Sequence, residues 1–175
     1  MAYGDDARFN TSVGNYFFSR LFEGCTTIIS VSDDFIPSNT LGSYCCAYMF
    51  KGCTNLIKPP KLPASSCSSY CYSNMFSGCT SLPYAPELKI SSSSSYLYYY
   101  MFYNCTSLQE LPKMSFKCTG SYAYAYMFSG CSGLTTINLT ISSSASYLCY
   151  GMFESCSNLA NVTLTWSNAS SSNIA

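Results

Sequence analysis

A block of apolar positions returns along this chain every 25 to 28 residues. It reads Met-Phe-x-x-Cys-x-x-Leu and begins at Met49, Met75, Met101, Met127 and Met152, after a diverged first copy over residues 21–28. A tyrosine stands five residues before each start, and these tyrosines are Tyr16, Tyr44, Tyr70, Tyr96, Tyr122 and Tyr147. A period of this length is typical of solenoids, propellers and repeat arrays.

Within each block, the apolar spacing predicts a short α-helix. Apolar or small residues fall at −4, 0, +1, +4 and +7 relative to the Met, as at Cys45, Met49, Phe50, Cys53 and Leu56. This spacing gives a helix one buried stripe. In the middle copies the residue before the Cys is Gly or Asn, which suits a helix end.

The segment after each block predicts a short strand. Residues 134–139 and 159–164 follow the pattern Leu-x-x-(Ile or Val)-x-Leu and end in strict alternation. The middle copies carry Pro59, Pro86 and Pro112 at this place, so we expect bulged or irregular strands there. The fold class is therefore α/β: a leucine-rich-repeat-type solenoid of about six repeats, each with one short strand and one short helix. The strands should form a parallel sheet on one face, with a right-handed coil.

The repeat unit resembles the BspA-type leucine-rich repeat. The resemblance rests on units such as Tyr70-Cys-Tyr-Ser-Asn-Met-Phe-Ser-Gly-Cys-Thr-Ser-Leu82, followed by a turn that contains Pro, and it covers residues 16–165. Such repeats occur on surface proteins of bacteria and some protists, and in proteins of viruses that infect gut bacteria. The resemblance implies adhesion or recognition, and it carries no shared catalytic residue.

The chain divides into three parts. Residues 16–166 form the repeat solenoid, residues 1–15 are an N-terminal flank or cap, and residues 167–175 are a C-terminal tail or linker. Solenoids expose apolar edges unless the terminal repeats are covered. We expect Trp166 to fold over the last repeat, unless another subunit or a continuation of the chain covers it.

Charge and hydropathy exclude two classes of partner. Only 9% of residues are charged, against about a quarter in an ordinary domain, and eight basic residues balance eight acidic ones. No basic patch follows a phosphate backbone, so nucleic acid is not expected as a partner. No run of about 20 apolar residues predicts a membrane span, and the first residues show no signal peptide. We expect a place on an extracellular surface or a virion.

Catalysis and cofactors find no support in the residues. The chain contains no His, so the commonest general base at neutral pH is missing. Glu87 and Glu110 fall at similar places in neighbouring repeats, but no pocket pattern accompanies this pair. No cofactor is expected, and a zinc site is disfavoured because Cys67 and Cys71 have loose spacing and no second clean pair. The protein is expected not to be an enzyme.

The invariant apolar positions predict structural ladders through the stack. We expect the ladder cysteines to be small buried side chains that face a turn in every repeat, whereas a disulfide from Cys67 or Cys71 to Cys45 or Cys46 remains an alternative. The ladder residues are Cys25, Cys53, Cys79, Cys105, Cys131 and Cys156, with Met49, Phe50, Met75, Phe76, Met101, Phe102, Met127, Phe128, Met152 and Phe153.

The residues between the repeated Tyr and the Met vary from copy to copy. They are mainly Tyr, Ser, Asn, Ala and Gly, which is the composition of adaptable binding surfaces. The candidate binding residues are Tyr72, Tyr98, Tyr99, Tyr100, Tyr124, Tyr126 and Tyr150. Two interpretations stay open at this point, because these tyrosines either form a recognition surface or pack against the next repeat.

Together these patterns predict a non-catalytic recognition or adhesion module. Its partner would be a protein or glycan on a cell surface, bound through a Tyr- and Ser-rich repeat surface by stacking and hydrogen bonds. The alternative is a structural virion component, such as a fibre, decoration or capsid-associated protein. In that role it would assemble with itself or with other virion proteins through the edges of the repeat stack.

Overall fold

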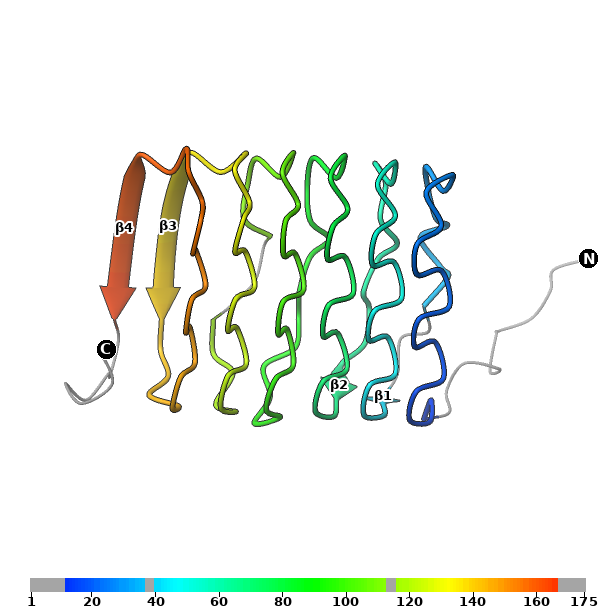
Figure 1. Ribbon diagram of the computed structural model, residues 1–175. Coiled ribbons are helices and arrows are strands. Elements are labelled where there is room, and N and C mark those ends of the chain that lie inside the picture. The colour runs from blue at the N-terminus through cyan, green and yellow to red at the C-terminus, as the bar shows by residue number, and fades with distance from the viewer. Residues whose placement is uncertain (1–11, 37–39, 113–115, 167–175) are drawn as a thin grey trace, which may run out of the picture.

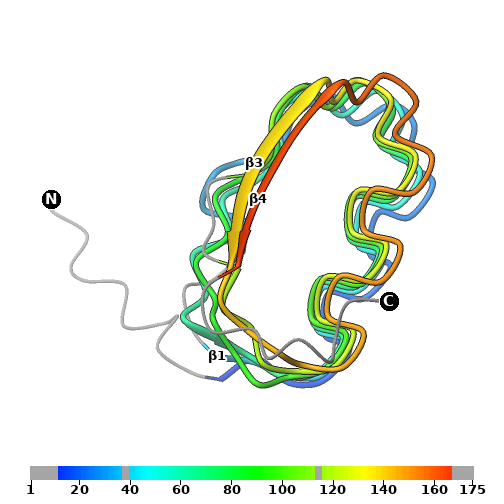
Figure 2. The ribbon, with the colours of Figure 1, turned by 90° about the vertical axis from the view of Figure 1, so that its left-hand side faces the viewer.

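The computed structural model describes residues 12–36, 40–112 and 116–166. Over these residues the chain coils into a stack of repeated turns, which we call rungs (Figure 1). Rungs 1 to 6 begin at Tyr16, Tyr44, Tyr70, Tyr96, Tyr122 and Tyr147. Seen down the stack, the rungs overlie one another as elongated loops (Figure 2). Apart from residues 12–15, the flanks expected at 1–15 and 167–175 lie outside the described residues.

The strands pair in parallel between neighbouring rungs, as predicted. β3 (Thr136–Ile141) lies beside β4 (Asn161–Trp166), with Ile137 opposite Val162. Alternate β3 residues point into the core, which accounts for the alternating sequence. The pair β1 (Thr40–Leu41) and β2 (Ser66–Cys67) is shorter and also parallel.

The Pro-containing repeats have no extended strand in the described part of the chain. At the place where β3 and β4 run in the last two repeats, rungs 1 and 2 are joined by a single parallel bridge between Ser30 and Lys58. Pro cannot donate to a ladder, so the regular pairing at this place is confined to β3 and β4, whose rungs lack it. The predicted irregularity at Pro59, Pro86 and Pro112 therefore has a direct physical cause.

The predicted short helices are wrong. No helix occurs among the described residues, and the segment that holds each Met-Phe-x-x-Cys block is a chain of β-turns. Positive φ angles recur at every fourth residue, as at Tyr44 (56°), Tyr48 (60°) and Gly52 (73°), and an α-helix admits none of them. A four-residue turn period and a 3.6-residue helix period bury nearly the same positions, which is why the sequence suggested a helix.

The core lies between the turn segments and the strands. Each Met, Phe, Cys and Leu of the block stands above its counterpart in the next rung, so like residues form columns. Phe50, Phe76, Phe102 and Phe128 are fully buried and stack with ring centroids 5.6 to 5.7 Å apart. Burying one such side chain contributes about 1.5–3 kcal/mol, and single rungs could not bury them alone.

Candidate functional surface

In the inner turn segments, backbone hydrogen bonds to the neighbouring rungs alternate with hydrogen bonds inside the turn. Tyr48 donates its N–H to the Ser73 carbonyl of the next rung (2.9 Å), and its own carbonyl accepts from Lys51 (3.1 Å). The next residue, Met49, has the opposite arrangement. Its N–H donates to the Cys46 carbonyl of the same turn segment (3.3 Å), and its carbonyl accepts from the Phe22 N–H of the preceding rung (2.9 Å). Every second local bond closes a β-turn whose third residue has positive φ, as a type II turn requires; the bond from Met49 to Cys46 does so around Tyr48. The result is a rigid ribbon that holds side chains at fixed places.

A column of stacked tyrosines runs the length of this ribbon. The column begins at Tyr16 and ends at Tyr147, and the ring centroids of consecutive members lie 4.5 to 5.0 Å apart, with ring planes within 8° of parallel. The four inner members are partly buried, whereas the two outer ones are exposed. Its members are the tyrosines at which the six rungs begin. These tyrosines do not vary between rungs, and their positions in the stack fit a structural role.

On rungs 4 to 6 the column widens into a patch of aromatic rings, which we call the tyrosine face. Tyr99 packs edge-on against Tyr96 and Tyr100, with ring centroids 5.3 and 4.5 Å apart. Tyr100 stacks on Tyr126 at 4.6 Å, and Tyr126 meets Tyr150 edge-on at 5.3 Å. The tyrosine face consists of Tyr96, Tyr99, Tyr100, Tyr103, Tyr122, Tyr126, Tyr147 and Tyr150, each partly or fully exposed.

Burial favours the neutral form of three phenols at the centre of the tyrosine face. Partial burial raises the pKa of Tyr100 to about 12, and it also raises the pKa of Tyr99. The pKa of Tyr126 is raised first by burial and then by its hydrogen bond with Tyr150. The hydroxyls of Tyr99, Tyr100 and Tyr126 therefore keep their protons, and each can both donate and accept a hydrogen bond. The surface offers apolar ring edges and neutral polar groups side by side.

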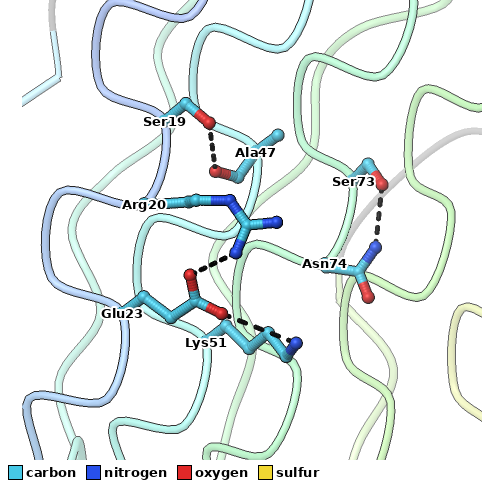
Figure 3. A network of polar contacts seen from close by, with 7 residues as sticks. All are labelled: Ser19, Arg20, Glu23, Ala47, Lys51, Ser73 and Asn74. Carbon is cyan, nitrogen blue, oxygen red and sulfur yellow. Dashed lines mark hydrogen bonds and ion pairs between the residues drawn. The ribbon is translucent and has the colours of Figure 1, made fainter.

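On rungs 1 and 2 the same surface is charged instead. Arg20 forms an ion pair with Glu23 (2.6 Å), Glu23 reaches Lys51 (3.5 Å), and the Arg20 guanidinium lies 4.2 Å from the Tyr48 ring centroid. Figure 3 shows the ion pairs of Glu23 with Arg20 and Lys51, with Asn74 on rung 3 beside them. These pairs are exposed and contribute little stability. They divide the surface into a charged half and an aromatic half.

Three of the candidate binding tyrosines are core residues, which corrects their assignment as surface anchors. Tyr72, Tyr98 and Tyr124 are at most 1% exposed. The Tyr98 hydroxyl donates to the Ile90 carbonyl (3.3 Å), and the Tyr124 hydroxyl accepts from the Cys118 N–H (3.0 Å). They stand three residues before the Met, a position that the turn ribbon points inward.

The other four candidates, Tyr99, Tyr100, Tyr126 and Tyr150, come together in the tyrosine face. Sequence reasoning did not include Tyr103, which follows the Met-Phe pair and contacts Tyr100 at 5.1 Å. Tyr96, Tyr122 and Tyr147 were not among its candidate binding residues either. A turn period of four would have placed all of these outside, so the missing signal was the ribbon geometry.

The cysteine ladder lines the inner side of the turns. Cys79 donates its thiol to the Phe50 carbonyl of the preceding rung at 3.1 Å, and the corresponding bond recurs from Cys53, Cys105, Cys131 and Cys156. Burial raises the pKa of Cys53 to about 11 and that of Cys131 to about 12. These thiols are protonated donors, as the carbonyl contact requires.

The remaining cysteines also carry free thiols. All twelve cysteines of the chain are unpaired in the structure. Side-chain hydrogen bonds link Cys45 to Cys46, Cys46 to Cys71, and Cys71 to Cys67. The bond from Cys46 lowers the pKa of Cys45, whereas burial is the main cause that raises the pKa of Cys71. The alternative of a disulfide among these four residues is thus not what the structure contains.

No catalytic or metal constellation stands out in the parts of the chain that the structure describes. Glu87 is exposed and pairs with Lys89 (3.4 Å), and Glu110 is exposed as well. Among the described residues, no three His, Cys, Asp or Glu side chains are placed to hold a metal ion. The described residues likewise include no helix with the length and apolar character of a membrane span.

The family comparison agrees with the repeat geometry. The BspA type leucine rich repeat region matches residues 9–112 and 72–174, in six copies. No curated protein and no solved structure matches the chain. Repeats of this family are typically surface-associated, commonly serve as binding modules, and are typically not enzymes. The chain belongs to the BspA-type leucine-rich repeat family.

Proposed function

We propose that the chain is a non-catalytic recognition module whose binding surface is the tyrosine face of rungs 4 to 6. The observation that supports this most is the contact network of eight partly exposed tyrosine rings, linked at centroid distances of 4.5 to 6.2 Å. Stacking holds the rings in place before a partner arrives. Binding therefore loses little side-chain entropy, which is the usual advantage of Tyr-rich recognition surfaces.

The partner is a protein or an uncharged glycan displayed on a cell surface. The tyrosine face offers neutral hydroxyls and ring edges. The Glu154 carboxylate lies close enough to raise the pKa of Tyr126 through its charge. Strongly charged ligands gain nothing from such a surface, because charge attracts only opposite charge. Neutral sugars and the polar, aromatic patches of proteins match it through hydrogen bonds and apolar contact.

The test measures binding of the labelled chain to an array of neutral glycans and to intact bacterial cells. Cells treated with protease, and cells treated with periodate, separate a protein partner from a glycan partner. The double variant Tyr100→Ala, Tyr126→Ala removes the centre of the tyrosine face. Tyr48→Ala is the matched control, because Tyr48 occupies the same column on rung 2 beside Arg20 and Lys51.

We expect the double variant to lose at least tenfold in affinity, while Tyr48→Ala binds as the parent does. Two lost aromatic anchors at about 1–2 kcal/mol each correspond to this change or more. Equal loss in both variants, or binding that survives the double substitution, would refute the assignment to the tyrosine face.

A further inference from the structure

The backbone hydrogen bonds between the Tyr-to-Cys turn segments all point the same way along the stack. At each of the five junctions between rungs, five backbone N–H groups of the earlier rung donate to five carbonyls of the later rung, over 2.7 to 3.3 Å. From rung 5 to rung 6, for example, Tyr126 donates to Tyr150 and Phe128 to Met152. The two ends of the ribbon are therefore chemically opposite.

Rung 6 presents a row of N–H donors, and rung 1 presents a row of carbonyl acceptors. The donors that would continue the pattern have no backbone acceptor among the described residues, and they are Tyr147, Cys149, Gly151, Phe153 and Ser155. The matching carbonyls accept no backbone donor among the described residues, and they are Asn15, Phe17, Ser19, Leu21 and Glu23. These N–H groups of rung 6 and these carbonyls of rung 1 recur at every second residue, as the bonded groups do at the five formed junctions.

The apolar side chains at these two edges are those that the inner rungs bury. Phe17 is 68% exposed and Leu21 51%, although their counterparts Cys45 and Met49 are fully buried. At the opposite edge, all of β4 is exposed, with Val162 at 54% where its counterpart Ile137 is at 2%. Covering both edges would bury them as every inner rung is buried.

The ring columns also continue across such a contact. Tyr16 and Tyr147 are the exposed ends of the tyrosine column, at 59% and 58%. Phe22 and Phe153 are the ends of the phenylalanine column, each stacked on one neighbour at 5.5 and 5.7 Å. A partner for the rung 6 edge must place a row of carbonyls, a Tyr ring and a Phe ring at matching positions. Rung 1 of this same chain does so.

We infer that a second copy of this chain docks its rung 1 onto rung 6 of the first, head to tail. The new junction repeats the five backbone hydrogen bonds, stacks Tyr16 of one copy on Tyr147 of the other, and sets residues 29–33 of one copy beside β4 of the other. The contact is heterologous, so the assembly keeps one free rung 1 edge and one free rung 6 edge however many copies dock. Since the rungs overlie one another with little rotation (Figure 2), the assembly is an open filament.

The test is sedimentation velocity of the full chain over a range of concentrations, with one variant for each edge. Phe17→Lys places a charge in the rung 1 edge, and Val162→Lys places one in the rung 6 edge. Both sites are exposed in the single chain, so each variant should fold, and circular dichroism with urea unfolding checks that it does. Ile57→Lys is the matched control, because Ile57 is 48% exposed on rung 2, away from both edges.

The parent and the Ile57→Lys control should show a mass that rises with concentration past two copies, while each edge variant alone stays at 19.2 kDa. Mixing the two edge variants should give dimers and nothing larger, because one supplies an intact rung 6 and the other an intact rung 1. A parent that is monomeric at every concentration would overturn the inference and mean that something else covers the edges. Association that persists in both edge variants, or a mixture that stays monomeric, would overturn it equally.

Discussion

Replacing Tyr70 by glycine should cost less stability than replacing it by alanine, the reverse of the usual order. Tyr70 stands at the start of rung 3 with φ at 60°, in the left-handed region. Its ring stacks on Tyr44 and on Tyr96, in each case with centroids 4.5 Å apart and planes 5° from parallel. Both substitutions remove these two stacks, and they differ only in what the backbone then requires.

The magnitudes follow from the two effects. Each aromatic pair contributes about 0.5–1.5 kcal/mol beyond burial, so either substitution loses about 1–3 kcal/mol from stacking. Alanine keeps the left-handed conformation at a cost of about 1–2 kcal/mol, which glycine does not have. Glycine in turn loses about 0.5–1 kcal/mol through its greater freedom in the unfolded chain. The balance favours Tyr70→Gly over Tyr70→Ala by about 0.5–1 kcal/mol.

Urea unfolding followed by circular dichroism measures this difference through the midpoint, compared at a common slope. Ala47→Gly is the control, because Ala47 is buried in the neighbouring turn and is not among the residues with positive φ. There glycine should lower the free energy of unfolding by about 0.5–1 kcal/mol. If Tyr70→Ala were as stable as Tyr70→Gly or more so, the left-handed turns would be refuted, and the predicted helix would regain support.

Three further predictions test other parts of the structure. Cys25 is the exposed thiol, so iodoacetamide should label it first in the folded chain and reach the buried ladder cysteines only after unfolding; prompt labelling of Cys79 would contradict the ladder. The pKa of Tyr70 and of Tyr100 is raised to about 12, above about 10 in the unfolded chain. Their contribution to stability should therefore be complete below pH 10 and lost between pH 10 and 12, as urea midpoints across that range would show. Gly78 and Gly151 both have positive φ, but a Cβ at Gly78 has 3.7 Å of room whereas one at Gly151 strikes the Tyr126 ring. Gly151→Ala should thus destabilise the chain by more than Gly78→Ala does, by about 1 kcal/mol or more in urea unfolding, and equal losses would contradict the position of Tyr126.

The repeat, its register and the strands could be predicted because they depend on one-dimensional pattern. The Leu-x-x-Ile-x-Leu segment alternates with period two, and β3 has that alternation in its burial. The turn ribbon could not be predicted, because Cys45, Met49 and Cys53 lie four apart and satisfy a helix equally well. What distinguishes the ribbon is the left-handed φ at Tyr44 and Tyr48, and bulky aromatic residues rarely adopt that conformation. Gly52 carried the same signal, but a glycine at a helix end explained it as well.

The strain at these tyrosines explains why the ribbon needs its neighbours. A single rung would hold several non-glycine residues in a conformation that costs about 1–2 kcal/mol each. Five hydrogen bonds to the next rung, each with a net value of about 0.5–1.5 kcal/mol, offset that cost only when another rung is present. Tyrosine adds a stacking partner where glycine would merely relieve the strain. A single rung is therefore not stable by itself, whereas a stack of rungs is. For the same reason, the two open edges favour the docking of further rungs.

Variation between repeats points to the proposed binding surface only after the turn geometry is known. The position three before the Met in rungs 2 to 5 holds Cys46, Tyr72, Tyr98 and Tyr124, and it varies although it is buried. The position one before the Met carries Arg20, Tyr48, Asn74, Tyr100 and Tyr126, and its φ stays between 54° and 60° throughout. An unchanged backbone under changing side chains means that these side chains are exchanged without altering the fold. In the proposed function, side chains of the outer column are therefore exchanged to suit a partner, while the buried columns keep the stack intact.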